Sequence, residues 1–206
     1  QISQIYVWTT TDPFISQTTS SGVLSAFRTT RTTFNGNIAH LISTRSTNMG
    51  GVAYLDVLCA TTYRHAFSNI YNSYGSFPTY SWTVNCFSHE MGHNFGSNHT
   101  QWCGWTGGAL DNCYTTEGGC AAGPAPVNGG TIMSYCHVTG YGVNLANGFG
   151  TQPGNKIRTK YLASTCLTGG VAISVVPAGA TICSGSNITL TASGATSYTW
   201  TPTTGL

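Results

Sequence analysis

Residues 89–99 read HEMGHNFGSNH, and the interpretation of the whole chain starts from this stretch. His89 and His93 are four residues apart, so on a helix they lie one turn apart on the same face. Two imidazoles in this arrangement can bind one tetrahedral zinc ion. Gly96 can adopt a positive φ and end the helix sharply, which would bring His99 back as a third ligand. Three protein ligands leave the fourth position open for water, as catalytic zinc sites do.

Glu90 directly follows the first histidine, where its carboxylate can reach that water without binding the metal. Proton transfer by a positioned carboxylate is general base catalysis. The chain has only five acidic residues, and one of them stands at this position. We therefore predict that Glu90 is the catalytic base.

A second motif lies at residues 131–136, which read TIMSYC. Together the two motifs resemble the metzincin zinc peptidases, in which a methionine turn lies below the metal site. The run FSHEMGHNFGSNH resembles the adamalysin or reprolysin branch, and NGGTIMSYCHVTGYGVNLANGFGTQPGNKIR is similar to bacterial secreted members of it. The resemblance covers residues 5–168. It implies that Met133 forms a hydrophobic floor and is not a metal ligand.

Two positions depart from that branch. Its eukaryotic members usually have Asp after the third histidine as a structural anchor, where this chain has Thr100. Tyr135 stands two residues after Met133, as in the astacin and serralysin branches, where such a tyrosine can contact zinc or the developing oxyanion. We hypothesise the same role here. The alternative is a packed tyrosine whose hydroxyl bonds the backbone.

A short apolar run after Gly50-Gly51 predicts a strand over residues 52–56. In similar peptidases a strand at this place is the antiparallel edge strand, which binds extended substrate by strand addition. The candidates for this role are Val52, Ala53, Tyr54 and Leu55. Ordinary edge-strand packing is the alternative.

The composition excludes several classes of partner. Only 6% of the residues are charged, and the net charge of +2 does not indicate nucleic-acid binding. No run of 18 apolar residues occurs, so we expect no membrane span. The hydrophobic content of 40% is sufficient for a packed core. We expect a monomer that acts on protein or peptide substrates.

Eight cysteines in no C-x-x-C pair indicate disulfides and an oxidising compartment, with buried thiols as the alternative. The resemblance implies a bridge between Cys59 and Cys166. Cys183 is expected to pair beyond Leu206, leaving one of the other seven cysteines unassigned. Four cysteines of unknown connectivity should cross-link the region around the methionine turn: Cys103, Cys113, Cys120 and Cys136.

Periodicity predicts the remaining elements in outline. Strands are expected over residues 4–10 and 40–44, and helices over 20–33 and 154–164. Pro78 should open the zinc helix, over 79–95, and residues 100–132 should be mostly loop. The buried stripe of the zinc helix is expected to consist of Val84, Phe87, Met91 and Phe95.

The fold class we expect is α+β. The resemblance implies a metzincin-type domain with a twisted mixed sheet, an antiparallel edge strand, a long zinc-binding helix and a loop-rich, disulfide-linked C-terminal part. We place this domain at residues 1–168, without the strand and helices that usually come first. A linker follows at 169–178, and 179–206 resemble the truncated start of an immunoglobulin- or PKD-like β-sandwich, with strands at 188–191 and 198–201.

The predicted function is secreted or cell-surface zinc endopeptidase, of a bacterial type. His89, His93 and His99 would bind one catalytic zinc, and Glu90 would act on its water. Calcium is compatible with similar secreted peptidases, but Asp12 and Asp56 are too isolated to define a site. Two alternatives are a zinc-bearing adhesin without activity and a hydrolase of cell-wall amides.

Overall fold

The computed structural model describes residues 2–45, 48–167, 174–177, 181 and 185–193. The chain divides into two units, Gln1–Cys166 and Leu167–Leu206. The first unit contains the histidine motif. No helix of the described residues is both long and apolar enough to cross a membrane.

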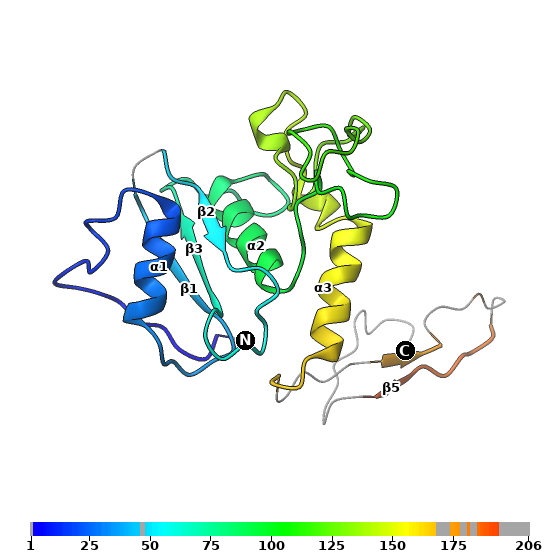
Figure 1. Cartoon of the computed structure of the whole chain (residues 1–206). Coiled ribbons are helices and arrows are strands. Elements are labelled where there is room, and N and C mark those ends of the chain that lie inside the picture. The colour runs from blue at the N-terminus through cyan, green and yellow to red at the C-terminus, as the bar shows by residue number, and fades with distance from the viewer. Residues whose placement is uncertain (1, 46–47, 168–173, 178–180, 182–184, 194–206) are drawn as a thin grey trace. The chain divides into compact units, whose positions relative to one another are not determined.

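A three-stranded mixed sheet forms the centre of the first unit (Figure 1). Its strands lie in the order β1 (Ala39–Ser43), β3 (His65–Asn69) and β2 (Gly51–Ala53). β1 runs parallel to β3, and β2 runs antiparallel to it with Val52 opposite Phe67. The antiparallel strand therefore lies at the edge of the sheet.

The strand expected over residues 52–56 is wrong in its bounds, because β2 ends at Ala53 and Leu55 and Asp56 form a turn. Asp56 has a φ of 58°, which a strand does not allow. Its N–H donates to the carbonyl of His93 at 2.8 Å. The chain leaves the sheet here because it bonds the end of the helix that carries the histidine motif instead.

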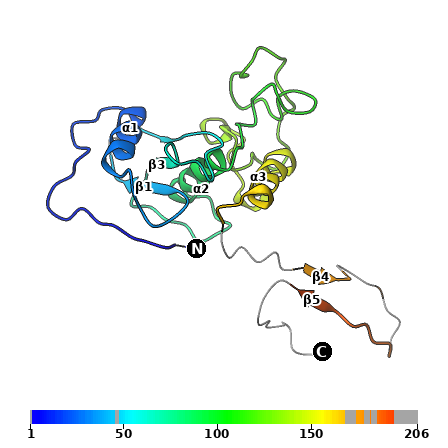
Figure 2. The same ribbon diagram turned by 60° about the horizontal axis from the view of Figure 1, so that its bottom comes forward.

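Helix α1 (Ser20–Thr30) packs on one face of the sheet and α2 (Trp82–Asn94) on the other, as Figures 1 and 2 show. α1 begins where Thr19 accepts a hydrogen bond from the N–H of Gly22, and it ends three residues before the predicted boundary. β3 is buried along its whole length between the helices. One core cluster joins α1 to the sheet: Phe14, Val23, Leu24, Phe27, Leu41, Met49 and Phe67.

The strand predicted at residues 4–10 is wrong. Ile5 and Val7 remain exposed, at 78% and 68%, and the segment forms no strand pairing. The segment is attached through a side chain instead, since Gln4 Oε1 accepts from the main-chain N–H of Asn35. An alternating pattern makes a strand only where a partner edge and a face to bury exist.

The buried stripe predicted for α2 is also wrong: Val84, Phe87, Met91 and Phe95 are only partly buried. The fully buried positions of the helix are mostly polar. Asn94 shows why, since its Nδ2 donates to the main-chain carbonyls of Tyr54 and His65 at 2.9 and 3.1 Å. The buried positions of α2 are Asn85, Cys86, His89, Glu90, Gly92 and Asn94.

Residues 100–132 form irregular loops, as expected, and the loops continue to residue 150 with two 3₁₀ turns, η1 (Cys136–Val138) and η2 (Leu145–Asn147). Helix α3 (Thr151–Ala163) then closes the unit, beginning three residues earlier than predicted. A second core cluster lies within the loops: Cys113, Ile132, Cys136, Val143 and Leu145.

Three disulfides cross-link the unit. The bridge between Cys59 and Cys166 is confirmed. The other two link Cys103 to Cys120 and Cys113 to Cys136. The unassigned cysteine is Cys86, a buried free thiol of α2. Cys183 lies outside the described residues.

In the second unit, β4 (Ser174–Val176) pairs antiparallel with β5 (Thr191–Ser193). β4 falls within the residues expected as linker, and β5 begins where the strand predicted at 188–191 was to end. The strand predicted at 198–201 lies outside the described residues. A β-sandwich here remains a prediction.

Candidate metal centre

The three histidines of the motif converge on one point. His93 Nε2 lies 3.2 Å from His89 Nε2 and 3.0 Å from His99 Nε2. Gly96 makes this possible: its φ is +90°, and a Cβ there would lie 2.8 Å from Asp56 Oδ1. The chain reverses at this glycine and returns His99 to the other two histidines.

Each imidazole is oriented through its other nitrogen. His89 Nδ1 lies 2.7 Å from the carbonyl oxygen of Ile132, and His93 Nδ1 lies 2.7 Å from that of Ser97. A carbonyl only accepts, so each Nδ1 carries the proton and donates it, leaving a lone pair on Nε2. Burial, followed by the neighbouring histidines, lowers the pKa of His89 far below 6.5 and that of His93 to about 4. Both rings are therefore neutral ligands at pH 7.

This donor set fits a zinc ion. Tetrahedral zinc with Zn–N distances of about 2.0–2.1 Å places ligand nitrogens roughly 3.3 Å apart, close to the distances between the Nε2 atoms. Three lone pairs at such short separation repel one another unless a cation lies between them. The three histidines can thus hold a metal ion.

A second group of potential ligands does not fit a metal. Asp111, Cys113 and Cys136 lie close together, but the two sulfurs are bonded to each other as a disulfide. They offer no thiolate, so this group retains a single carboxylate.

Glu117 is a site residue that the sequence analysis missed. Its Oε1 lies 2.7 Å from His99 Nδ1 and 3.1 Å from Gln101 Nε2, and both nitrogens donate to it. The carboxylate orients the third histidine, as carbonyls orient the other two. Its isolation in the sequence could have identified it, because no charged residue follows Glu117 until Lys156.

Glu90 is 5% exposed, and burial raises the pKa of its carboxyl group to about 8. A Cβ built on Gly51 of β2 would overlap this carboxyl group. Glu90 therefore lies between α2 and the edge strand, in space that only glycine leaves free. A divalent cation at the adjacent histidines would favour the ionised carboxylate.

Met133 is fully buried and contacts α2 beneath the histidines, since a Cβ on Gly92 would come within 2.5 Å of its sulfur. The N–H of Thr100 donates to the Met133 carbonyl, and the Thr100 carbonyl accepts from Leu110. The main chain of Thr100 thus links the methionine turn to the loops. Its buried hydroxyl has no hydrogen-bond partner among the described residues.

The ring of Tyr135 lies beside two of the histidines, with its centroid 4.6 Å from that of His99 and 5.8 Å from that of His89. Burial, then Glu90 and Glu117, raises the pKa of its hydroxyl to about 12. The hydroxyl is therefore protonated at pH 7 and can act as a donor.

Of the candidate substrate-binding residues, Val52 and Ala53 lie in β2, and Tyr54 continues its hydrogen bonding to His65. Leu55 has left the strand and is 48% exposed. The structure thus places three of the four at the sheet edge.

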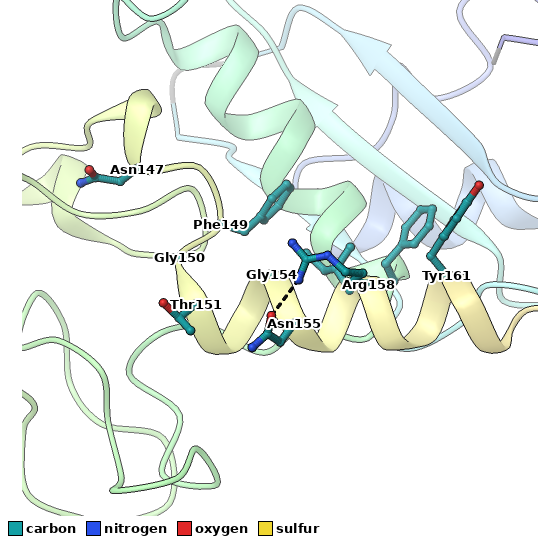
Figure 3. A pocket seen from close by; sticks show the side chains of 10 residues that line it. Asn147, Phe149, Gly150, Thr151, Gly154, Asn155, Arg158 and Tyr161 are labelled. Atoms are coloured by element: carbon teal, nitrogen blue, oxygen red, sulfur yellow. Dashed lines mark hydrogen bonds between the residues drawn. The ribbon is translucent and has the colours of Figure 1, made fainter. Parts of the chain in front are cut away.

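A pocket lies elsewhere in the first unit, along α3 (Figure 3). Its volume is about 710 Å³, which is within the usual range for ligand sites. Its lining includes none of the three converging histidines, nor Glu90 or Tyr135. It includes Phe95 and Phe149 together with Arg158, which donates to Asn155 Oδ1 at 2.7 Å. This pocket is not the candidate metal centre.

Comparison with known protein families gives one match. A reprolysin-type family model, described as metallo-peptidase family M12, matches residues 1–145. No curated protein matches the chain. The matched range includes the three histidines, Glu90 and the methionine turn. The chain therefore belongs to metallopeptidase family M12, as a reprolysin-like metzincin.

Proposed function

We propose that this protein is a secreted zinc-dependent endopeptidase. The observation that carries the proposal is the convergence of three imidazole nitrogens, with each ring oriented through its second nitrogen. His89, His93 and His99 hold the metal. When bound, zinc polarises the scissile carbonyl and lowers the pKa of a water molecule towards about 7.

Glu90 is the general base in this proposal. Its carboxylate removes a proton from the attacking water and later passes it to the leaving amine. Burial raises the pKa of this carboxyl group to about 8, and a divalent cation held by the adjacent histidines would lower it again, leaving a carboxylate that can accept a proton. Its place beside β2 puts it next to the strand on which a peptide would lie.

Tyr135 is proposed to stabilise the oxyanion. The position of its ring beside His99 supports this, as does a hydroxyl that keeps its proton at pH 7. A donor that is already oriented stabilises developing negative charge most effectively. Replacement by Phe removes only the hydroxyl, so an unchanged kcat/KM in Tyr135→Phe would refute this role.

Substrate is proposed to bind by strand addition to β2. Among the described residues β2 lies at the edge of the sheet, paired with β3, and the main chain of Val52 and Ala53 can bond a peptide on the other side. Tyr54 extends this edge, whereas Leu55 can contribute only a side-chain contact.

Three disulfides support secretion, since such bonds persist in oxidising compartments. We propose that the protein acts as a monomer, with residues 1–168 as the peptidase domain and 179–206 as the start of a β-sandwich. Asp12 and Asp56 pair with Arg45 and Lys160, so calcium remains a prediction without a defined site.

The test is hydrolysis of casein or gelatin by zinc-loaded protein, with and without a zinc chelator. Cleavage that the chelator abolishes supports a zinc peptidase. A protein that retains one zinc per chain but cleaves neither substrate would instead be an adhesin or an amide hydrolase. Release of fragments from cell-wall peptides would then distinguish those two.

A further inference from the structure

A continuous row of aromatic side chains leads away from the metal centre. The ring of Tyr135, beside His99, is followed by that of His137, with their centroids 5.7 Å apart. Trp82 follows at 5.3 Å from His137, and Tyr71 stacks on Trp82 at 5.7 Å with an interplanar angle of 21°. We refer to Tyr135, His137, Trp82 and Tyr71 as the aromatic row.

The row is both held in place and accessible. Trp82 Nε1 donates to the carbonyl of Asn69 at 2.7 Å, which fixes the indole at the start of α2. Tyr71 is 36% exposed, and the other three side chains are half-buried. A Cβ on Gly50 would lie 4.0 Å from the indole of Trp82. Since Gly50 immediately precedes β2, the row begins at the metal centre and passes the edge strand proposed to bind substrate.

The loop between β3 and α2 extends this surface. Three more aromatic side chains in it are exposed: Tyr74 at 71%, Phe77 at 66% and Tyr80 at 37%. Contiguous exposed apolar side chains mark interaction sites more often than isolated ones do.

The segments that carry the row have no formal charge. Residues 65–89 and 118–155 contain no Asp, Glu, Lys or Arg. The two carboxyl groups that act electrostatically on Tyr135 are in use, because Glu90 is buried and Glu117 accepts from His99 and Gln101. A charged substrate side chain placed on the row would lose water without gaining an ionic partner.

We propose that the aromatic row binds an uncharged, extended stretch of the polypeptide substrate that carries aromatic or other apolar side chains, and discriminates against charged ones. The proposal rests on the proposed function and specifies its substrate class. Alternate side chains of an extended peptide lie about 6.6 Å apart on one face, close to the spacing of successive rings. A peptide lying along β2 can therefore place several side chains on the row in turn.

The test uses three quenched fluorescent peptides of equal length with the same scissile residues, cleaved by the zinc-loaded full chain. One carries Phe or Tyr at alternate flanking positions, and in the others Lys or Glu replaces them. We expect kcat/KM for the aromatic peptide to exceed the value for either charged peptide by about tenfold or more. An aromatic contact contributes up to roughly tenfold in binding affinity.

Variants of the row identify the surface responsible. Trp82→Ala and Tyr71→Ala should raise KM for the aromatic peptide by about two- to tenfold. Trp82→Phe retains a ring and should keep most of the preference. The matched control is Tyr161→Ala, on α3, because Tyr161 is 38% exposed and lies outside the row. This control should leave all three rates unchanged.

The outcomes separate the two proposals. Equal kcat/KM for the aromatic and charged peptides, or an unaltered KM in both alanine variants, would refute substrate binding by the aromatic row. Neither result would contradict the proposed peptidase function. Failure of zinc-loaded wild-type protein to cleave any of the peptides or casein would remove the proposed function and this inference with it. If Trp82→Ala unfolds, Tyr71→Ala decides the matter, because its side chain is at the surface.

Discussion

The two parts of the metal centre are held in place by different means. His89, His93 and Glu90 lie on a regular helix that packs on a sheet, and main-chain carbonyls orient both imidazoles. His99 comes from irregular loops, and there a side chain, Glu117, orients the ring. The helical half is therefore determined by the fold itself. The loop half depends on a few side chains and cross-links that can be removed singly.

The largest effect should come from the helical half. Glu90→Gln should bind zinc and fold like the wild type but lose about 10²–10⁴-fold in kcat, because the amide cannot remove a proton from water. Zinc content per chain and hydrolysis of a fluorescent peptide measure the two properties. Substantial turnover by a zinc-loaded sample would contradict the base assignment.

The next effect concerns the cross-link beside the third ligand. Cys103 and Cys120 close a loop around Glu117, whose main chain bonds both Cys103 and Gln101. Replacing both cysteines by serine should cost about 3 kcal/mol of unfolding free energy, as expected for a loop of this length, and should weaken zinc binding. Thermal unfolding and a zinc competition assay test this.

Cys86→Ala is the matched control for the removal of sulfur, because Cys86 lies in the helical half and forms no disulfide. It should leave zinc affinity close to the wild-type value. If the Cys103→Ser/Cys120→Ser variant binds zinc as tightly as the control does, the loop half does not depend on this bridge.

A smaller effect is expected for Glu117 alone. Glu117→Ala removes the acceptor of His99 Nδ1 and should lower zinc affinity by about 10–100-fold, with little change in stability. Asp12→Ala is the control, since it also removes one carboxylate but pairs with Arg45 away from the site. Equal zinc affinities in the two variants would mean that Glu117 does not orient the ligand.

The same contrast explains which features were predictable from the sequence. His89 and His93 follow from helical spacing, and the position of His99 follows from a glycine at φ +90°. These are local properties of the chain. Glu117 reaches His99 across 18 residues through loops whose path depends on disulfides, and no periodic pattern records such a contact.

Strand β3 was missed for a related reason. It is buried on both faces, yet it contains His65, Ser68 and Asn69, so it shows neither alternation nor an apolar run. Its polar groups are satisfied by tertiary partners, such as Met49 O for Asn69 Nδ2 at 2.7 Å. The buried face of α2 is polar too, and Asn94 Nδ2 on it donates to the carbonyls of Tyr54 and His65. Hydrophobic patterns predict apolar cores, whereas this core is partly hydrogen-bonded.

A final prediction concerns that partly polar core. His40 of β1 stacks on Phe87 at 4.3 Å, and its Nε2 lies 2.8 Å from Ser68 Oγ. Burial lowers its pKa from 6.5 to about 3. The unfolded chain therefore takes up a proton below pH 6.5 while the folded protein does not. Stability is complete above pH 6.5 and decreases towards pH 3, by up to about 1.4 kcal/mol per pH unit.

Loss of zinc from protonated His89 and His93 also destabilises the protein in acid, so the contribution of His40 must be isolated. His40→Gln keeps a polar partner for Ser68 but does not titrate. Urea unfolding of both proteins from pH 7 to pH 4 should give a shallower decrease for His40→Gln, because metal loss affects both proteins equally and cancels in the difference. Identical slopes would mean that His40 does not remain neutral in the folded protein, and that the sheet tolerates a charge at this position.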